Sequence, residues 1–136
     1  MDQDQLSAAF ERADAGLAAL EIALGGETPP PLEATVEDAL ALLRELIVAY
    51  IGDGGKKAPP PADADILDVW KVLVKGEPYW NTIRDNLREL VYYRNCIAMN
   101  RRDALPAVPE KMAVRTARHV YLFIRTRCIR EGRIAA

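Results

Sequence analysis

The chain is poor in the residues from which most catalytic and metal sites are built. Its 136 residues include one histidine, His119, and two cysteines, Cys96 and Cys128. These residues are too few, and too far apart in the sequence, to supply the four ligands of a structural zinc site. No Glu-x-x-His pair is present for a di-iron site, and no glycine-rich loop joins a strand to a helix to hold phosphate. We therefore expect no metal and no cofactor.

Long apolar runs are also lacking, and we expect no signal peptide. No run approaches the roughly 18 to 20 residues that a membrane span needs. The first residues, MDQDQLSAAFERAD, carry acids where a signal peptide carries bases and then an apolar stretch. We expect a cytoplasmic protein that is not in a membrane. Two cysteines are too few for a disulfide framework, and antiparallel final helices would hold them roughly 20 Å apart, so we expect both to be reduced.

Aromatic residues are scarce, and the chain has only two phenylalanines. Its apolar residues are mostly Ala, Leu, Ile and Val, a composition that favours helices over a β-sandwich. Half of all residues are hydrophobic and 28% are charged, which is typical of a globular protein. A chain of this length fits one domain, so we expect residues 1–136 to form a single helical domain.

Apolar residues at helical spacing divide the chain into five segments. The clearest stripe alternates spacings of four and three residues and comprises Leu6, Phe10, Ala13, Leu17, Leu20 and Leu24. Thr35, with Asp38 three residues on, is expected to cap the second helix. The pattern predicts helices near residues 4–24, 35–51, 65–75, 79–99 and 110–130. Residues 52–64, GDGGKKAPPPADA, are predicted to form an exposed Gly/Pro-rich connection. The predicted fold is all-α, an up-and-down bundle of four to five helices.

An arginine interrupts the apolar stripe of the helix predicted over 79–99. The stripe comprises Trp80, Ile83, Leu87 and Leu90, then Arg94, then Ile97. Burying an unpaired charge costs several kcal/mol, so something must satisfy Arg94. It either extends to the edge of the bundle, pairs with an acid of another helix or of a partner chain, or belongs to a functional site.

Residues 94–100, RNCIAMN, resemble the Arg-Asn-x-x-x-His segment of the HEPN superfamily of small helical-bundle proteins. The surroundings agree, because the apolar helix LRELVYY precedes the segment and a polar turn and one more helix follow it. The resemblance implies a HEPN-like helical bundle and frequent homodimerisation. In many members it also implies RNA cleavage by the paired arginine and histidine, whereas other members act in binding or assembly.

The position of the family's histidine is occupied here by Met99, or by Asn100 if one more residue is allowed. Neither side chain titrates near neutral pH, so neither can act as a general acid or base. Arg94 and Asn95 can still bind phosphate or hold a dimer interface. His119 lies on the last predicted helix, and we interpret it as a partly buried structural residue rather than as a replacement base.

Charge is distributed unevenly along the chain. Residues 1–55 carry a net charge of −9, residues 56–100 one of +1, and residues 101–136 one of +6. Two interpretations stay open. Acidic and basic helices lie side by side or pair between subunits, or the basic end offers a surface to nucleic acid or to an acidic partner.

The basic and aromatic residues near the chain's end are candidate binding residues. Arg115, Arg118 and Arg125 fall near one face of the last helix. Tyr92 and Tyr93 could add stacking surface for single-stranded RNA, but aromatic residues beside arginine are equally typical of protein interfaces. We favour protein.

The sequence therefore favours a protein that is not an enzyme and has no catalytic residues. We expect it to act through self-association or as a small accessory subunit of a larger complex. The candidate interface residues are Arg94, Asn95, Arg115, Arg118, Arg125, Tyr92 and Tyr93. We expect a homo-oligomer and a protein partner. The alternative is a HEPN-type ribonuclease or RNA-binding protein.

Overall fold

The chain folds into helices and the segments that connect them. A computed structural model describes residues 2–136, and the side chains from Asp4 onward. The helices are α1 (Asp2–Leu24), α2 (Leu32–Gly54), α3 (Ile66–Val74), α4 (Arg84–Ala98) and α5 (Pro109–Arg130), with 3-10 helices η1 (Pro78–Ile83) and η2 (Arg102–Ala104). Over the described residues there is no strand, which confirms the predicted all-α bundle.

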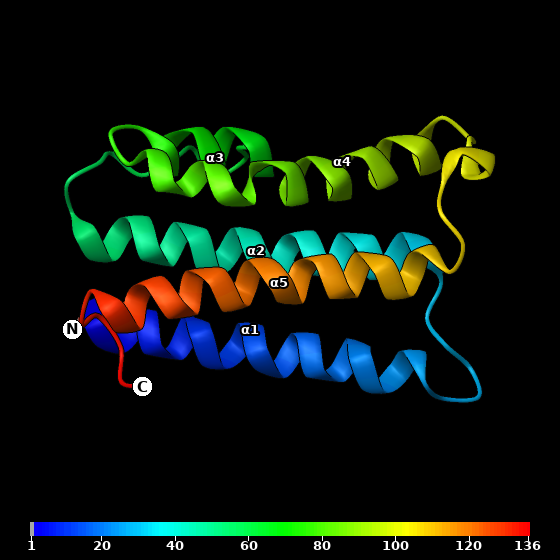
Figure 1. The fold of residues 1–136 in the computed structure, drawn as a ribbon, viewed down its shortest axis with the longest axis horizontal. Coiled ribbons are helices and arrows are strands. Elements are labelled where there is room, and N and C mark those ends of the chain that lie inside the picture. The colour runs from blue at the N-terminus through cyan, green and yellow to red at the C-terminus, as the bar shows by residue number, and fades with distance from the viewer. Residues whose placement is uncertain (1) are drawn as a thin grey trace.

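The helices run up and down along one long axis (Figure 1). α2 is central, because it packs against α1, α3, α4 and α5. α3, η1 and α4 follow one another along one side of it, and α5 returns between α4 and α1. The 25–31 and 99–108 segments both lie at one end of the bundle, which we call the connection end. α2 and α5 both finish at the other end, which we call the opposite end.

The core is a continuous apolar cluster to which every α-helix contributes. The first stripe predicted from the sequence is buried from Leu6 to Leu20, whereas Leu24 is half-buried. Near the opposite end the fully buried Trp80 ring lies 5.1 Å from Tyr50, 5.0 Å from Tyr79 and 5.7 Å from Phe123, between ring centroids. Such aromatic pairs contribute roughly 0.5–1.5 kcal/mol beyond their buried area. The aromatic cluster therefore fastens η1 onto α2 and α5.

Two predicted helices differ from those in the structure. The second helix starts at Leu32 rather than Thr35, because the buried Leu32 packs into the core while Pro31, in an extended conformation, provides the N-cap position. Thr35 is therefore inside the first turn, and its hydroxyl donates to the Pro31 carbonyl at 2.9 Å instead of capping the helix. The helix predicted over 79–99 begins as the 3-10 helix η1 at Pro78 and becomes α-helical only at Arg84.

Both cysteines are buried and free, as expected from the sequence. Burial raises the pKa of the Cys128 thiol to about 12, so this thiol is almost wholly protonated at neutral pH. Within the described part of the chain, no helix combines the length and the apolar character that crossing a membrane requires.

Val108 is held in a strained backbone conformation at the start of α5. Its φ of 51° and ψ of 58° lie in the left-handed region, directly before Pro109. A side chain branched at Cβ is poorly suited to this region, and the residue before a proline favours extended backbone. Val108 is 54% exposed, so little buried apolar area compensates for the strain.

We predict that Val108→Asn stabilises the protein. Left-handed backbone costs an ordinary residue roughly 1–2 kcal/mol, and asparagine tolerates it better. The free energy of unfolding should rise by about 1 kcal/mol and Tm by about 3–5 °C, as measured by thermal denaturation. Val108→Thr keeps the branched Cβ and serves as the control. A threonine variant that gains as much as the asparagine variant would contradict the assignment of strain.

Candidate functional site

Arg94, the central residue of the sequence resemblance, is engaged in a two-pronged ion pair. Its two terminal guanidinium nitrogens lie 2.7 Å and 2.8 Å from the two carboxylate oxygens of Asp65. Asp65 immediately precedes α3, so the pair ties α4 to the start of that helix. The hydrogen bond from Arg94 lowers the pKa of Asp65 below its usual value, although partial burial opposes the shift. One N–H of each terminal nitrogen is therefore committed to Asp65, and a phosphate would have to compete with this carboxylate for the two-pronged contact.

The prediction that Arg94 lies in line with the buried stripe is wrong. α4 buries Leu87, Leu90, Tyr93 and Cys96, whereas the Arg94 side chain is 32% exposed. Positions three and four residues after Leu90 are both near its face of a helix, and the structure turns Tyr93 inward. Among the alternatives, an acid of the same chain satisfies Arg94.

The other candidate residues of α4 have different environments. Tyr93 is buried, and its hydroxyl donates to Glu89 at 2.7 Å. Burial and Glu89 together raise the pKa of Tyr93. Tyr92 is 49% exposed and its hydroxyl donates to the Ala104 carbonyl at 3.4 Å, while Asn95 is exposed. Only Tyr92 and Asn95 can therefore contact a partner over much of their surface.

Arg118 is committed to α1. Its guanidinium lies 2.6 Å from Asp14 and 2.8 Å from Glu21, and the hydrogen bonds that it donates to Glu21 raise its pKa. Arg102 pairs with Glu33 of α2, and Arg133 pairs with Asp53 at 3.2 Å. Acidic and basic elements thus lie side by side within one chain, which is one of the two interpretations of the charge pattern.

Arg115 and Arg125 lie in different surroundings. Arg115 is exposed and lines a pocket of about 440 Å³ between α1 and α5, together with His119. Arg125 lines another pocket of about 300 Å³ with Phe10 and Tyr121. No acid of the described residues forms an ion pair with either arginine. The predicted basic face is therefore divided between separate sites.

His119 does not complete a site with Arg94. It is exposed and faces the pocket between α1 and α5, whereas Arg94 pairs with the segment before α3. The interpretation of His119 as partly buried is therefore wrong. The side chains near Arg94 include Asp65 and, through its charge, Glu37, and both are acids that stabilise the arginine. The described residues also contain no cluster of potential metal ligands.

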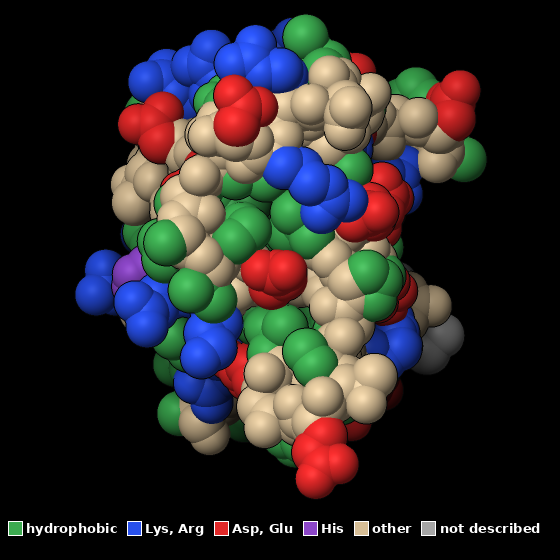
Figure 2. Space-filling model, turned by 90° about the vertical axis from the view of Figure 1, so that its right-hand side faces the viewer, with side chains coloured by type: hydrophobic (Ala, Val, Ile, Leu, Met, Phe, Trp, Pro, Cys, Tyr) green, Lys and Arg blue, Asp and Glu red, His purple; other side chains and the backbone are tan. Residues whose placement is uncertain are grey.

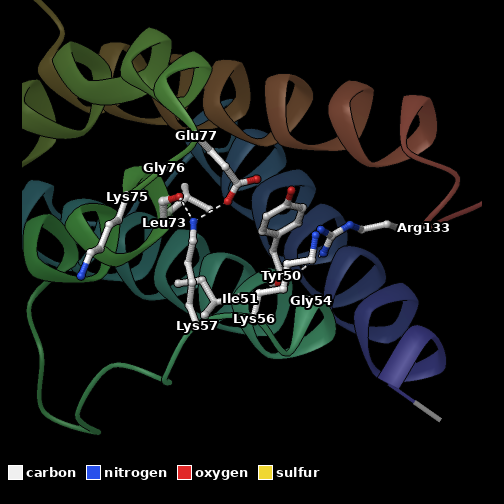
Figure 3. Close-up of a pocket in the computed structure, with 10 residues that line it drawn as sticks. All are labelled: Tyr50, Ile51, Gly54, Lys56, Lys57, Leu73, Lys75, Gly76, Glu77 and Arg133. Carbon is white, nitrogen blue, oxygen red and sulfur yellow. Dashed lines mark hydrogen bonds and ion pairs between the residues drawn. The ribbon is translucent and has the colours of Figure 1, made fainter.

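A polar network that the sequence did not reveal lies at the opposite end of the bundle (Figure 3). The Lys57 ammonium donates to the Leu73 carbonyl at 2.6 Å and also pairs with Glu77. The Tyr79 hydroxyl lies 2.7 Å from Glu77 and 3.1 Å from Glu131. The chain connections after α2, α3 and α5 are therefore joined through side chains.

Arg133 extends this network over the end of α2. It lies 3.2 Å from Asp53 and 2.9 Å from Glu131, and its guanidinium covers the Tyr50 ring at 4.1 Å from the centroid. Tyr50 also donates to Glu131 at 2.9 Å, and burial raises the pKa of its hydroxyl. Tyr50 and Arg133 form part of the wall of a pocket of about 310 Å³.

Glu77 is ionised in this network. Burial alone raises its pKa, but hydrogen bonds from Lys57 and Tyr79 outweigh burial and lower the pKa below its usual value. The sequence analysis missed this network because its residues form no motif. Lys57, Glu77 and Glu131 lie in three separate segments, which follow α2, α3 and α5.

Comparisons with protein families, with curated proteins and with solved structures find no match to this chain. The resemblance of residues 94–100 to the HEPN segment therefore remains a prediction.

We predict a modest, pH-dependent coupling between Arg94 and Asp65. A double-mutant cycle with Arg94→Gln and Asp65→Asn should give about 0.5–1 kcal/mol, because both side chains are partly exposed. The pKa of Asp65 is lower in the folded state than in the unfolded state, where it is about 4. The contribution of the pair to the free energy of unfolding is therefore complete above the unfolded pKa and is lost as the pH falls through the folded pKa. Denaturant unfolding from pH 7 to pH 2 measures both effects.

The pair Lys71 and Asp68 is the control. Its atoms are 3.8 Å apart and both side chains are more than half exposed, so its coupling should be close to zero. An Arg94–Asp65 coupling that matches this control, or that grows below about pH 4, would contradict the role assigned to the pair.

Proposed function

We propose that the chain is a non-catalytic helical-bundle protein that acts through self-association or as a small accessory subunit of a larger complex. The observation that carries the proposal is the state of Arg94. Both of its terminal nitrogens donate hydrogen bonds to Asp65. Met99, which is 71% exposed, occupies the position at which the HEPN segment carries its histidine. RNA cleavage needs a group that moves a proton from the ribose hydroxyl, and thioether sulfur cannot do this.

The surface best suited to a protein partner lies at the connection end. We call Tyr92, Met99 and Val108 the apolar tip, since they are 49%, 71% and 54% exposed. Tyr92 belongs with the other two because its hydroxyl contacts the Ala104 carbonyl in the same connection. Figure 2 views this end, where apolar side chains are exposed between groups of basic and acidic ones.

Two features of the apolar tip support a binding role. Tyrosine and methionine are enriched in the centres of protein interfaces, where charged residues are depleted. Strained backbone, as at Val108, is commonly retained at functional sites. Arg101 and Arg102 belong to the same connection and pair with Asp103 and Glu33, so charged side chains also lie at this end of the bundle. An apolar centre within a charged rim is the usual arrangement of an interface.

We predict that the purified chain is at least a dimer and that Met99→Glu dissociates it. A carboxylate buried in an interface loses hydration without gaining a partner, which costs several kcal/mol. Light scattering at tens of micromolar in moderate salt gives the mass. Leu122→Glu is the matched control, because Leu122 is 46% exposed and lies roughly 20 Å along α5 from Val108.

If the unmutated protein is a monomer, the proposed self-association is wrong. The accessory-subunit form would then require a protein that co-purifies with the tagged parent and is lost with Met99→Glu. If neither a dimer nor such a protein is found, the apolar tip is not an interface.

We predict no cleavage of single-stranded or structured RNA above background. General acid–base help is commonly worth about 10²- to 10⁴-fold in rate, and the base is missing here. Labelled RNA is incubated with the parent and with Arg94→Ala, which should affect stability rather than turnover. Cleavage by the parent that Arg94→Ala abolishes would replace this proposal with the ribonuclease alternative.

A further inference from the structure

Lysines gather in a groove at the opposite end of the bundle. Two pockets, of about 310 Å³ and about 610 Å³, adjoin there and share Lys56, Lys57 and Lys75 in their walls. Lys71 lines the larger pocket. Arg133 lines the smaller one, which Figure 3 shows. We call these two joined pockets the lysine groove. Glu77 is the one acid among the residues that line them.

Backbone geometry brings the lysines together. Lys71 is in the last turn of α3 and Lys75 follows it by four residues, which places both near one side. Gly55, with a φ of 64°, ends α2 in the left-handed conformation and turns the chain toward α3. Lys57 then fixes the turned segment in place through the Leu73 carbonyl and Glu77. The groove is therefore formed in the folded protein without a ligand.

The charges of the groove are only partly balanced. Lys57 is paired with Glu77, Lys71 has a distant partner in Asp68 at 3.8 Å, and Arg133 is paired with Asp53. No acid of the described residues forms an ion pair with Lys56 or Lys75. Like charges held together in a concave site repel one another and attract anions from solution. An anion bound in the groove would reduce that repulsion.

The walls of the groove indicate the kind of anion. Its apolar parts come from Ile51, Leu73, Ala58 and Val72, all of them aliphatic. Tyr50 is the one aromatic residue in the lining, and it is 3% exposed with Arg133 over its ring. No aromatic face is open for stacking a nucleobase. Lysine ammonium groups act as point charges toward phosphate oxygens, and the volumes are in the range of small-molecule sites.

We propose that the lysine groove binds a small, non-aromatic molecule with several phosphate groups, such as an oligophosphate or a bisphosphorylated sugar. Lys56 and Lys75 hold the phosphates, and Lys57 donates to them with the ammonium hydrogen that its two partners leave over. This site is separate from the apolar tip, which lies at the other end of the bundle.

The test is calorimetric titration of the full chain with tripolyphosphate, at about 0.1 M salt, where distant surface charges are screened. We expect saturable binding at one site. Lys56→Gln/Lys75→Gln should weaken it by about tenfold or more, since the change removes two charged donors of hydrogen bonds to phosphate. Arg88→Gln/Lys111→Gln removes the same charge from exposed positions of α4 and α5 outside the groove and should change affinity less than about twofold.

Four results would overturn the proposal. One is the absence of saturable tripolyphosphate binding at about millimolar concentration. Another is an equal loss of tripolyphosphate affinity in the two double variants. In a parallel arm, ATP should bind no more tightly than tripolyphosphate, and tighter binding of ATP would show that a base is recognised after all. A single-stranded RNA oligonucleotide that binds the same lysines more tightly would assign the groove to nucleic acid instead. Circular dichroism of both variants verifies that they remain folded.

Discussion

The burial of Trp80 is the interaction on which the opposite end of the molecule depends. Its ring joins Tyr50 of α2, Tyr79 of η1 and Phe123 of α5, and its carbonyl accepts a hydrogen bond from the Trp70 indole at 3.0 Å. Its own indole N–H is buried without a partner among the described residues, a cost that the surrounding apolar contacts offset. Because Tyr50 and Tyr79 are oriented by this contact, their hydroxyl groups meet Glu131, and the polar network closes around it.

Charge is arranged around this core so that the two ends of the bundle differ. Four acids of α1 and α2 pair with arginines of the second half of the chain: Asp14 and Glu21 with Arg118, Glu33 with Arg102, and Asp53 with Arg133. The lysines near α3 are left with fewer acids, although the middle third of the sequence is almost neutral. A net charge therefore says little about where a surface is basic, because pairing in space decides it.

The sequence predicted the fold well and the site poorly, for identifiable reasons. Helical periodicity is a property of neighbouring residues, so the stripe from Leu6 to Leu20 could be read directly. The same periodicity could not decide between Tyr93 and Arg94, since both follow Leu90 at a permitted spacing. The pairing of Arg94 with Asp65 joins residues 29 positions apart, and that of Tyr50 with Glu131 joins residues 81 apart. Such pairs depend on packing that no local pattern encodes.

The burial of both native thiols has a practical consequence for studying motion in this bundle. Cys96 and Cys128 are shielded by the core, and the protonated state of Cys128 makes it a poor nucleophile. A cysteine introduced on the surface would therefore outcompete them for a maleimide dye or a nitroxide label in the native protein. One label at each end of the bundle would make the spacing between the apolar tip and the lysine groove directly measurable in solution, with the natural cysteines left in place.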